Sequence, residues 1–199
     1  MEWLIIDGIG PFFRGYRKKR VNWSKVPFSH LESETGLDPD RVTAVRDAFR
    51  MFIERARAAG FNTVTMDDVA HLVPWGGYST ELQRRIHAYR AFYAELFQFA
   101  ADAGMRVLLT TDVMFYTPEL RHTLGNSVQK TALWLRNGLE ELFAGFPQVA
   151  GVVMRFGECD GKDHPSDFRS QLLLRTSRQT RRFLRTLLPL FEREGRTLF

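Results

Sequence analysis

A recurring junction between a helix and a strand is the feature that most constrains the fold of this chain. In three places a helix end rich in alanine or charged residues meets a glycine and then an apolar strand, in the segments ARAAGFNTVTMDD, AADAGMRVLLTTD and FEREGRTLF. The glycines of these segments, Gly60, Gly104 and Gly195, are 44 and 91 residues apart, which corresponds to one and two repeats of roughly 45 residues. A chain that alternates strands and helices at a fixed period is typical of an α/β protein with parallel strands.

Hydrophobic periodicity gives the elements of each repeat. We expect strands at 3–7, 62–67, 105–111 and 149–156, and the start of a fifth strand at 196–199. The intervening helices should begin near Asp38, at Thr80 with Gln83 in a capping box, and at Asn126 or Ser127, because these side chains suit the N-cap position. A fourth helix should end at Gly195.

Two architectures have this alternation, the doubly wound open sheet and the (β/α)8 barrel. The first strand is followed by Asp7-Gly8-Ile9-Gly10, but Pro11 and Phe12 interrupt the glycine-rich turn of a dinucleotide-binding sheet. The sequence therefore favours a single domain of the TIM-barrel type over residues 1–199. Four to five strands amount to a partial barrel, because a complete one needs about 250 residues. We expect a fragment of a longer protein, a half-barrel that forms an oligomer, or an open sheet.

Composition indicates a folded, soluble domain with 44% apolar and 26% charged residues. Cys159 is the one cysteine, so no intramolecular disulfide is possible and a reducing compartment fits. The N-terminus has no secretory signal pattern, and no apolar run is long enough for a membrane helix. These features predict a cytoplasmic protein without a membrane partner.

Arginine dominates the net charge of +5. The last helix is rich in arginine, and Arg17-Lys18-Lys19-Arg20 forms a second basic segment. Neither has the interleaved aromatic residues of a nucleic-acid-binding motif, so we favour a solvated helix face and expect no specific nucleic-acid partner.

Acidic residues follow several of the expected strands at their carboxyl ends. Asp68 and Asp112 follow the second and third strands, and the segment VVMRFGECDG brings Arg155 and Glu158 to the end of the fourth. Barrel enzymes carry their chemistry at this edge of the sheet. We therefore expect these four side chains to converge on one mouth, with Asp67 or Asp68 also able to serve as a loop cap.

Trp75 and Tyr116 belong to the loops after the second and third strands. Their rings on the rim of the mouth would suit stacking on the apolar face of a sugar. Packing within the loops is the alternative for both residues.

Metal and cofactor sites are not expected. The chain holds no His-x-His or His-Glu-x-x-His pattern and no cysteine cluster, although acidic residues and histidines recur from Asp68 to His164. A serine nucleophile elbow is also absent from the sequence.

The segments FFRGYRKKRVNWSKVPFSHLE, TMDD and GVVMRFGE resemble the N-terminal half of a glycoside-hydrolase-type (β/α)8 barrel, and the α-glucuronidase-like enzymes in particular. The resemblance implies a carbohydrate substrate and a catalytic acid at Glu158, where strand four ends. It also implies a second catalytic carboxylate on a later strand, beyond residue 199. Gly157 stands where that superfamily commonly has asparagine.

Glycoside hydrolysis needs one carboxylic acid to protonate the leaving oxygen and one carboxylate as nucleophile or base. We expect Glu158 to be the general acid, and Arg155 to bind a sugar hydroxyl or carboxylate. In the alternative, Glu158 is structural and Arg155 forms a buried ion pair with Asp112. The chain would then be a non-catalytic half-barrel that binds sugar or assembles with another chain.

Overall fold

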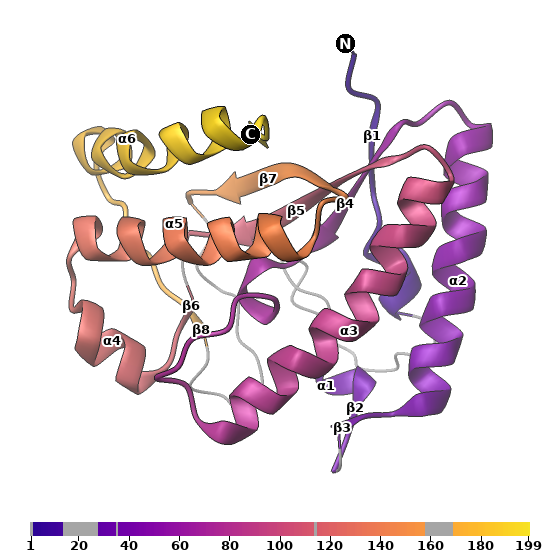
Figure 1. The fold of residues 1–199 in the computed structure, drawn as a ribbon, viewed down its shortest axis with the longest axis horizontal. Coiled ribbons are helices and arrows are strands. Elements are labelled where there is room, and N and C mark those ends of the chain that lie inside the picture. The colour runs from indigo at the N-terminus through magenta and orange to yellow at the C-terminus, as the bar shows by residue number, and fades with distance from the viewer. Residues whose placement is uncertain (1, 14–27, 35, 114, 158–168) are drawn as a thin grey trace.

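A parallel sheet of five strands organises the molecule (Figure 1). The computed structural model describes residues 2–13, 28–34, 36–113, 115–157 and 169–199. The strands lie in the order in which they occur along the chain, and every neighbouring pair is parallel, as predicted. They are β1 (Ile5–Asp7), β4 (Thr63–Asp67), β5 (Arg106–Asp112), β7 (Val149–Arg155) and β9 (Thr197–Leu198).

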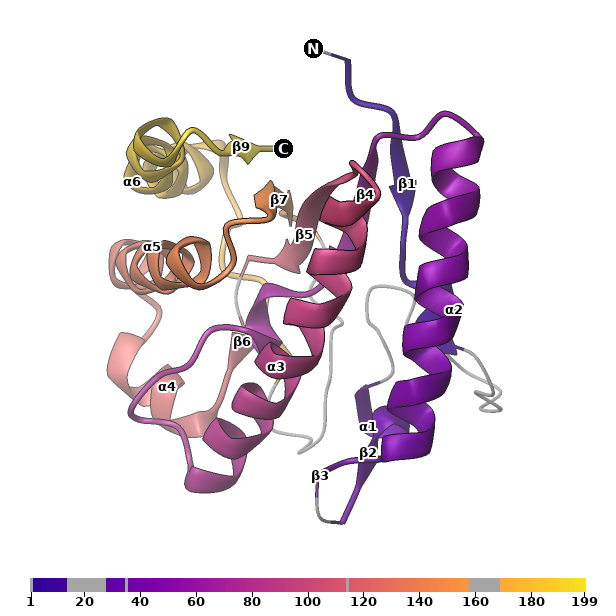
Figure 2. The ribbon, with the colours of Figure 1, turned by 45° about the vertical axis from the view of Figure 1, so that its right-hand side comes forward.

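Four long helices connect these strands and lie along one side of the sheet (Figures 1 and 2). Each crossover advances to the next strand in the same direction, and right-handed crossovers then bring every helix to the same face. The long helices are α2 (Pro39–Ala58), α3 (Thr80–Asp102), α5 (Val128–Gly145) and α6 (Ser177–Glu194).

The helix N-termini are capped by hydroxyl and carboxylate side chains. Asp38 accepts hydrogen bonds from the backbone N–H groups of residues 40 and 41, as its position in the sequence predicts. The prediction of Thr80 as the next cap is wrong by one residue, because Ser79 accepts from Leu82 N. Ser127 caps α5, and a capping box forms at Thr176 at the start of α6.

Two short antiparallel ladders lie outside the main sheet, and the periodicity did not predict them. The β2 strand (Glu32–Ser33) pairs with β3 (Gly36–Leu37), and β6 (Phe115–Tyr116) pairs with β8 (Arg169–Ser170). The second ladder joins the segments that follow β5 and β7. The remaining short elements are η1 (Gly10–Phe13), α1 (Phe28–Leu31), η2 (Val69–His71) and α4 (Pro118–Leu124).

The two faces of the sheet differ in burial. Val64, Met66 and Leu109 point toward the helices and are fully buried in the main core. Residues one position along each strand point the other way, and Thr65 and Thr110 on this second face are only half-buried. The second face carries both half-buried and fully buried residues, and the long helices lie on the other face.

A contact between the two ends of the chain shows that this second face is concave. The rings of Trp3 and Phe199 lie 5.3 Å apart, edge to face. Trp3 precedes β1, and Phe199 continues β9 through hydrogen bonds to Val152 and Met154. On a flat sheet, four strand spacings of about 4.8 Å would separate β1 from β9 by ~19 Å, which is more than two ring side chains span. The sheet therefore curls around the face opposite the helices.

Candidate functional site

Three charged side chains meet on the concave face where β4, β5 and β7 end. Arg155 Nε lies 3.2 Å from Asp112 Oδ1, and Arg155 Nη1 lies 3.7 Å from Asp67 Oδ1. Both carboxylates are buried, whereas the side chain of Arg155 is 20% exposed. The guanidinium group thus lies between two buried acids and reaches toward solvent.

The register of the sheet brings these residues together. Asp112 on β5 is the ladder partner of Arg155 on β7, so their side chains leave the sheet on the same face. Asp67 on β4 pairs with Thr110, which is two residues before Asp112 and therefore shares that face. We name Asp67, Asp112 and Arg155 the strand-end cluster.

The three charges of the strand-end cluster stabilise one another. A buried carboxylate is costly without a counter-charge, and one guanidinium here serves two carboxylates. Within the described residues, neither oxygen of Asp112 meets the geometry of a hydrogen bond, although Arg155 is within ion-pair distance. Both oxygens of Asp112 are buried, so Arg155 is the member of the cluster that faces solvent.

Asp7 extends this polar edge to β1. Its Oδ1 accepts a weak hydrogen bond from Thr65 Oγ1 at 3.4 Å and one from the Ile9 backbone N–H at 3.2 Å. Asp7 and Thr65 are ladder partners and lie on the concave face with the strand-end cluster. Three neighbouring strands, β1, β4 and β5, thus each end in an aspartate on this face.

Asp68 does not join the cluster, contrary to our expectation of a substrate-binding role at the mouth. Its side chain is fully buried, accepts a hydrogen bond from the backbone N–H of Ala70 at 2.7 Å, and lies 3.2 Å from His71 Nδ1. It therefore caps η2, while the neighbouring Asp67 faces Arg155. Tyr93 on α3 donates a hydrogen bond of 2.5 Å to the backbone carbonyl of Asp67 and so anchors the end of β4.

The aromatic residues expected on the rim pack against other rings and helices. Tyr116 is 3% exposed, and its hydroxyl lies 3.4 Å from Thr131 Oγ1 on α5. Burial raises the pKa of Tyr116, although Thr131 and Arg121 act in the opposite direction. Trp75 is half-buried and packs edge-on against Tyr78, at 5.2 Å, and Trp134, at 6.5 Å. Tyr116 is thus a core residue, and packing within the loops describes its position better than a sugar platform.

Glu158 lies outside the described residues, as do Cys159, Asp160, Asp163 and His164. The expected convergence of Glu158 with Asp112 and Arg155 therefore stays a prediction. Its place in the chain is three residues after Arg155, which itself belongs to the strand-end cluster.

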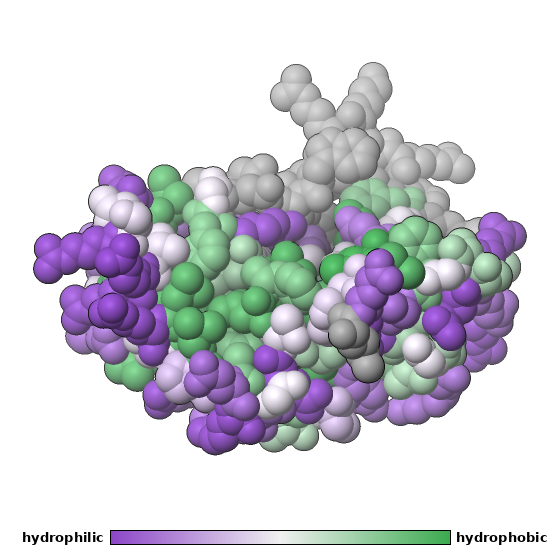
Figure 3. Space-filling model, turned by 90° about the horizontal axis from the view of Figure 1, so that it is seen from above, coloured by the Kyte–Doolittle hydropathy of each residue, from purple (hydrophilic) through white to green (hydrophobic). Residues whose placement is uncertain are grey.

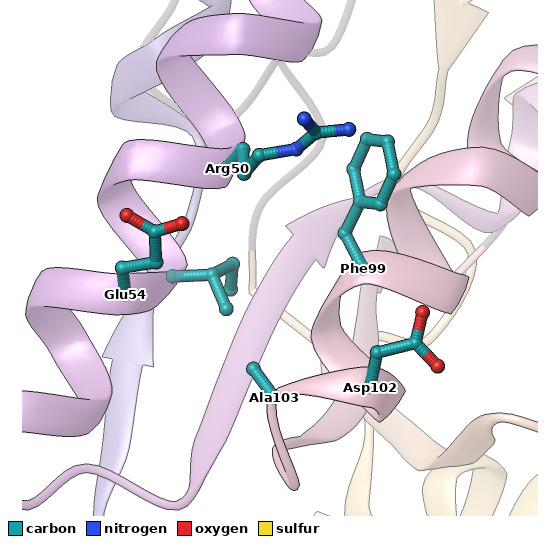
Figure 4. A pocket seen from close by; sticks show the side chains of 6 residues that line it. Arg50, Glu54, Phe99, Asp102 and Ala103 are labelled. Atoms are coloured by element: carbon teal, nitrogen blue, oxygen red, sulfur yellow. The ribbon is translucent and has the colours of Figure 1, made fainter.

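A cavity of about 330 Å³ between α2 and α3 is not part of this site (Figure 4). Its lining includes Arg50, which stacks on Phe99 at 4.5 Å. The cavity lies in the C-terminal halves of both helices, and helices that precede strands place their C-termini at the opposite edge of the sheet from Arg155. Among the residues that the structure describes, no group of three or more His, Cys, Asp or Glu side chains could hold a metal ion.

Comparisons with known proteins do not assign the chain to a family. No protein-family model matches it, and a comparison with curated proteins gives no significant match. In the described ranges, no helix has both the length and the apolar character needed to cross a membrane.

Proposed function

We propose that this chain is a glycoside-hydrolase-like protein that acts on carbohydrate, with Glu158 as the general acid. The strand-end cluster is the observation that carries the proposal. It combines two buried carboxylates and a partly exposed guanidinium at the carboxyl edge of a parallel sheet, where α/β proteins bind their ligands. Sugar hydroxyl groups both donate and accept hydrogen bonds, and the cluster offers an acceptor and a donor side by side.

The TIM-barrel type of fold belongs to the same proposal. A curled sheet with sequential parallel strands and all long helices on its convex side is compatible with part of a (β/α)8 barrel. In such a barrel the concave face is the interior, and the strand-end cluster would line its mouth.

The proposed roles follow from charge. Glu158 would protonate the glycosidic oxygen, which requires a carboxylic acid that still holds its proton, and a second carboxylate, expected on a later strand, would act as the nucleophile or base. Asp67 and Asp112 are buried and paired with Arg155, so we assign them to holding the guanidinium group in place rather than to proton donation. Arg155 would orient the sugar through its exposed edge.

The test compares Glu158→Gln with Glu192→Gln, which removes an exposed carboxylate near the end of α6. Release of reducing ends is measured on neutral and acidic oligosaccharides and on aryl glycosides. We expect kcat to fall about 10²–10⁴-fold in the first variant, the range typical of a lost general acid, and to stay unchanged in the second. Equal activity in the two variants would contradict the role of Glu158, and no hydrolysis by the unaltered natural protein would contradict the hydrolase.

A second candidate is a non-catalytic half-barrel that binds sugar or assembles with another chain, here a second copy of itself. The exposed apolar residues at the two edges of the sheet favour it, because Leu4, Ile5 and Phe199 are 43%, 37% and 45% exposed. Figure 3 shows apolar residues gathered between α6 and the N-terminal segment. A two-fold axis parallel to the strands would bring β9 of one copy beside β1 of the other and keep all strands parallel.

Sedimentation velocity over a range of concentrations tests this second candidate. A dimer that dissociates after Phe199→Ser or Ile5→Ser would support assembly through the edge strands β1 and β9. A monodisperse monomer at all concentrations that unfolds cooperatively would contradict it.

A further inference from the structure

The outward face of α6 carries a second charged feature, separate from the strand-end cluster. Arg178, Arg181, Arg182 and Arg185 follow one another at intervals of three, one and three residues, which places them on one side of the helix. All four side chains are exposed, and together with Ser177 they line a surface hollow of about 660 Å³. Hydrophilic residues gather over α6 on the left of Figure 3. We name these four residues the arginine row.

The positive charge of the arginine row is not balanced locally. The sequence from 169 to 191 contains no aspartate or glutamate. In the part of the chain that the structure describes, no carboxylate lies within ion-pair distance of the row; the one hydrogen-bond acceptor found for it is the Gln129 amide, 3.1 Å from Arg182 Nε. By contrast, Arg193 in the last turn of the same helix pairs with Glu140 at 2.6 Å.

The row lies at the end of the molecule where the strand-end cluster is found. The β7 strand ends at Arg155, and after the next connection α6 begins at Ser177 and runs back toward the opposite edge. In Figure 1 the head of the β7 arrow and the first turns of α6 are on the same side. A long ligand bound at the strand ends would therefore have the arginine row beside its path.

The geometry of the row selects among anionic partners. Guanidinium groups bind carboxylates through two parallel hydrogen bonds, and a row of about 10 Å can engage successive groups of a linear polymer. The row has no aromatic side chain on which a base could stack. The apolar side of α6, including Phe183 and Leu187, is buried against the protein and cannot enter a membrane.

We propose that the arginine row binds the carboxylates of an acidic polysaccharide, a chain of uronic acid sugars, and guides it toward the strand-end cluster. The choice of a carbohydrate among polyanions rests on the proposed function. Binding of a polyanion would explain why four arginines without nearby carboxylates lie on the helix that follows the site.

The test measures binding of a fluorescent ten-sugar oligogalacturonate to the full chain at low and high salt. The variant R178Q/R181Q/R185Q spares Arg182, which contacts α5, and should bind at least tenfold more weakly with a smaller salt dependence. The control R46Q/R55Q/R193Q removes the same charge elsewhere and should keep the affinity. A neutral xylo-oligosaccharide should bind equally to all three proteins.

Three outcomes would overturn the inference: no binding of oligogalacturonate by the unaltered chain, equal loss in the two triple variants, or tighter binding of a ten-residue oligothymidylate through the same arginines. The Glu158→Gln variant separates this inference from the proposed function, because it should bind oligogalacturonate like the unaltered chain. Row-dependent binding by that variant supports the inference even where hydrolysis is absent.

Discussion

Arg155 Nε lies 3.2 Å from Asp112 Oδ1, and the same two residues are ladder partners between β5 and β7. The charge pair and the strand register therefore depend on each other. A slip of one residue would move Arg155 to the helix-covered face and leave a guanidinium in the apolar core. The strand-end cluster thus contributes to the register of the sheet as well as to the candidate site.

Replacing Arg155 with glutamine should destabilise the protein strongly. The substitution removes the guanidinium group that pairs with the buried carboxylates of Asp67 and Asp112, a loss that typically costs about 3–5 kcal/mol. Urea unfolding measures the effect, and Arg193→Gln is the control, because its pair with Glu140 is exposed to solvent and should contribute little to stability.

The double variant Asp112→Asn/Arg155→Gln should recover part of this loss of stability, because one of the two buried carboxylates is removed together with Arg155. Additive losses from the two single substitutions would contradict the coupling between these side chains.

Gly151→Ala should weaken the pairing of β9 with the sheet. A Cβ atom at position 151 would lie 2.1 Å from the backbone oxygen of Thr197, which cannot yield without moving β9. We expect a loss of about 1–3 kcal/mol, typical of overpacking. Gly76→Ala is the control, since nothing lies within 4 Å of its added Cβ. Similar unfolding midpoints for the two variants would contradict the close approach of β7 and β9.

The repeat of helix, glycine and strand was sufficient to predict the main sheet. Gly60, Gly104 and Gly195 all have positive φ angles, of 93°, 70° and 61°, so a local backbone requirement produced the repeated sequence signal. The order of the strands in the sheet followed from this repeat, because right-handed crossovers of similar length allow few arrangements of the strands. The two-residue ladders gave no such signal, since two residues cannot show a period.

The candidate site was predictable only in part. The face of the sheet on which a side chain lies depends on the register between neighbouring strands, and the sequence alone does not give that register. Asp67 and Asp68 are adjacent, and the sequence alone did not decide which would face Arg155. Asp67 is in phase with Thr65, which pairs with Leu108 on the face of Asp112, and counting by twos from the paired residues would have identified it. Tyr116 was misplaced for another reason: the β6–β8 ladder and α5 bury it, and both contacts come from distant segments.

Tyr93→Phe should loosen the end of β4. The Tyr93 hydroxyl donates a 2.5 Å hydrogen bond to the Asp67 carbonyl inside the core, and removing a buried donor typically costs about 1–3 kcal/mol. Amide exchange in β4 should rise together with the loss of stability. Thr123→Ala is the control. It removes an exposed hydrogen bond from the Thr123 hydroxyl to the Glu119 carbonyl and should change stability by less than about 0.5 kcal/mol. Unchanged exchange in β4 after Tyr93→Phe would contradict the anchoring role.

Alkaline pH should destabilise the protein through Tyr78. Burial raises the pKa of Tyr78 above its ordinary value of 10.0, so above that pH the unfolded chain loses a proton that the folded chain keeps. Stability therefore falls as pH rises, by up to about 1.4 kcal/mol per pH unit for one proton. The difference in unfolding free energy between the unaltered protein and Tyr78→Phe should be constant below pH 9 and should shift in favour of the variant above pH 10. Tyr116→Phe should shift in the same direction, because burial raises that pKa too. A difference that stays constant up to pH 12 would show that these hydroxyl groups ionise as readily in the folded protein as in the unfolded chain.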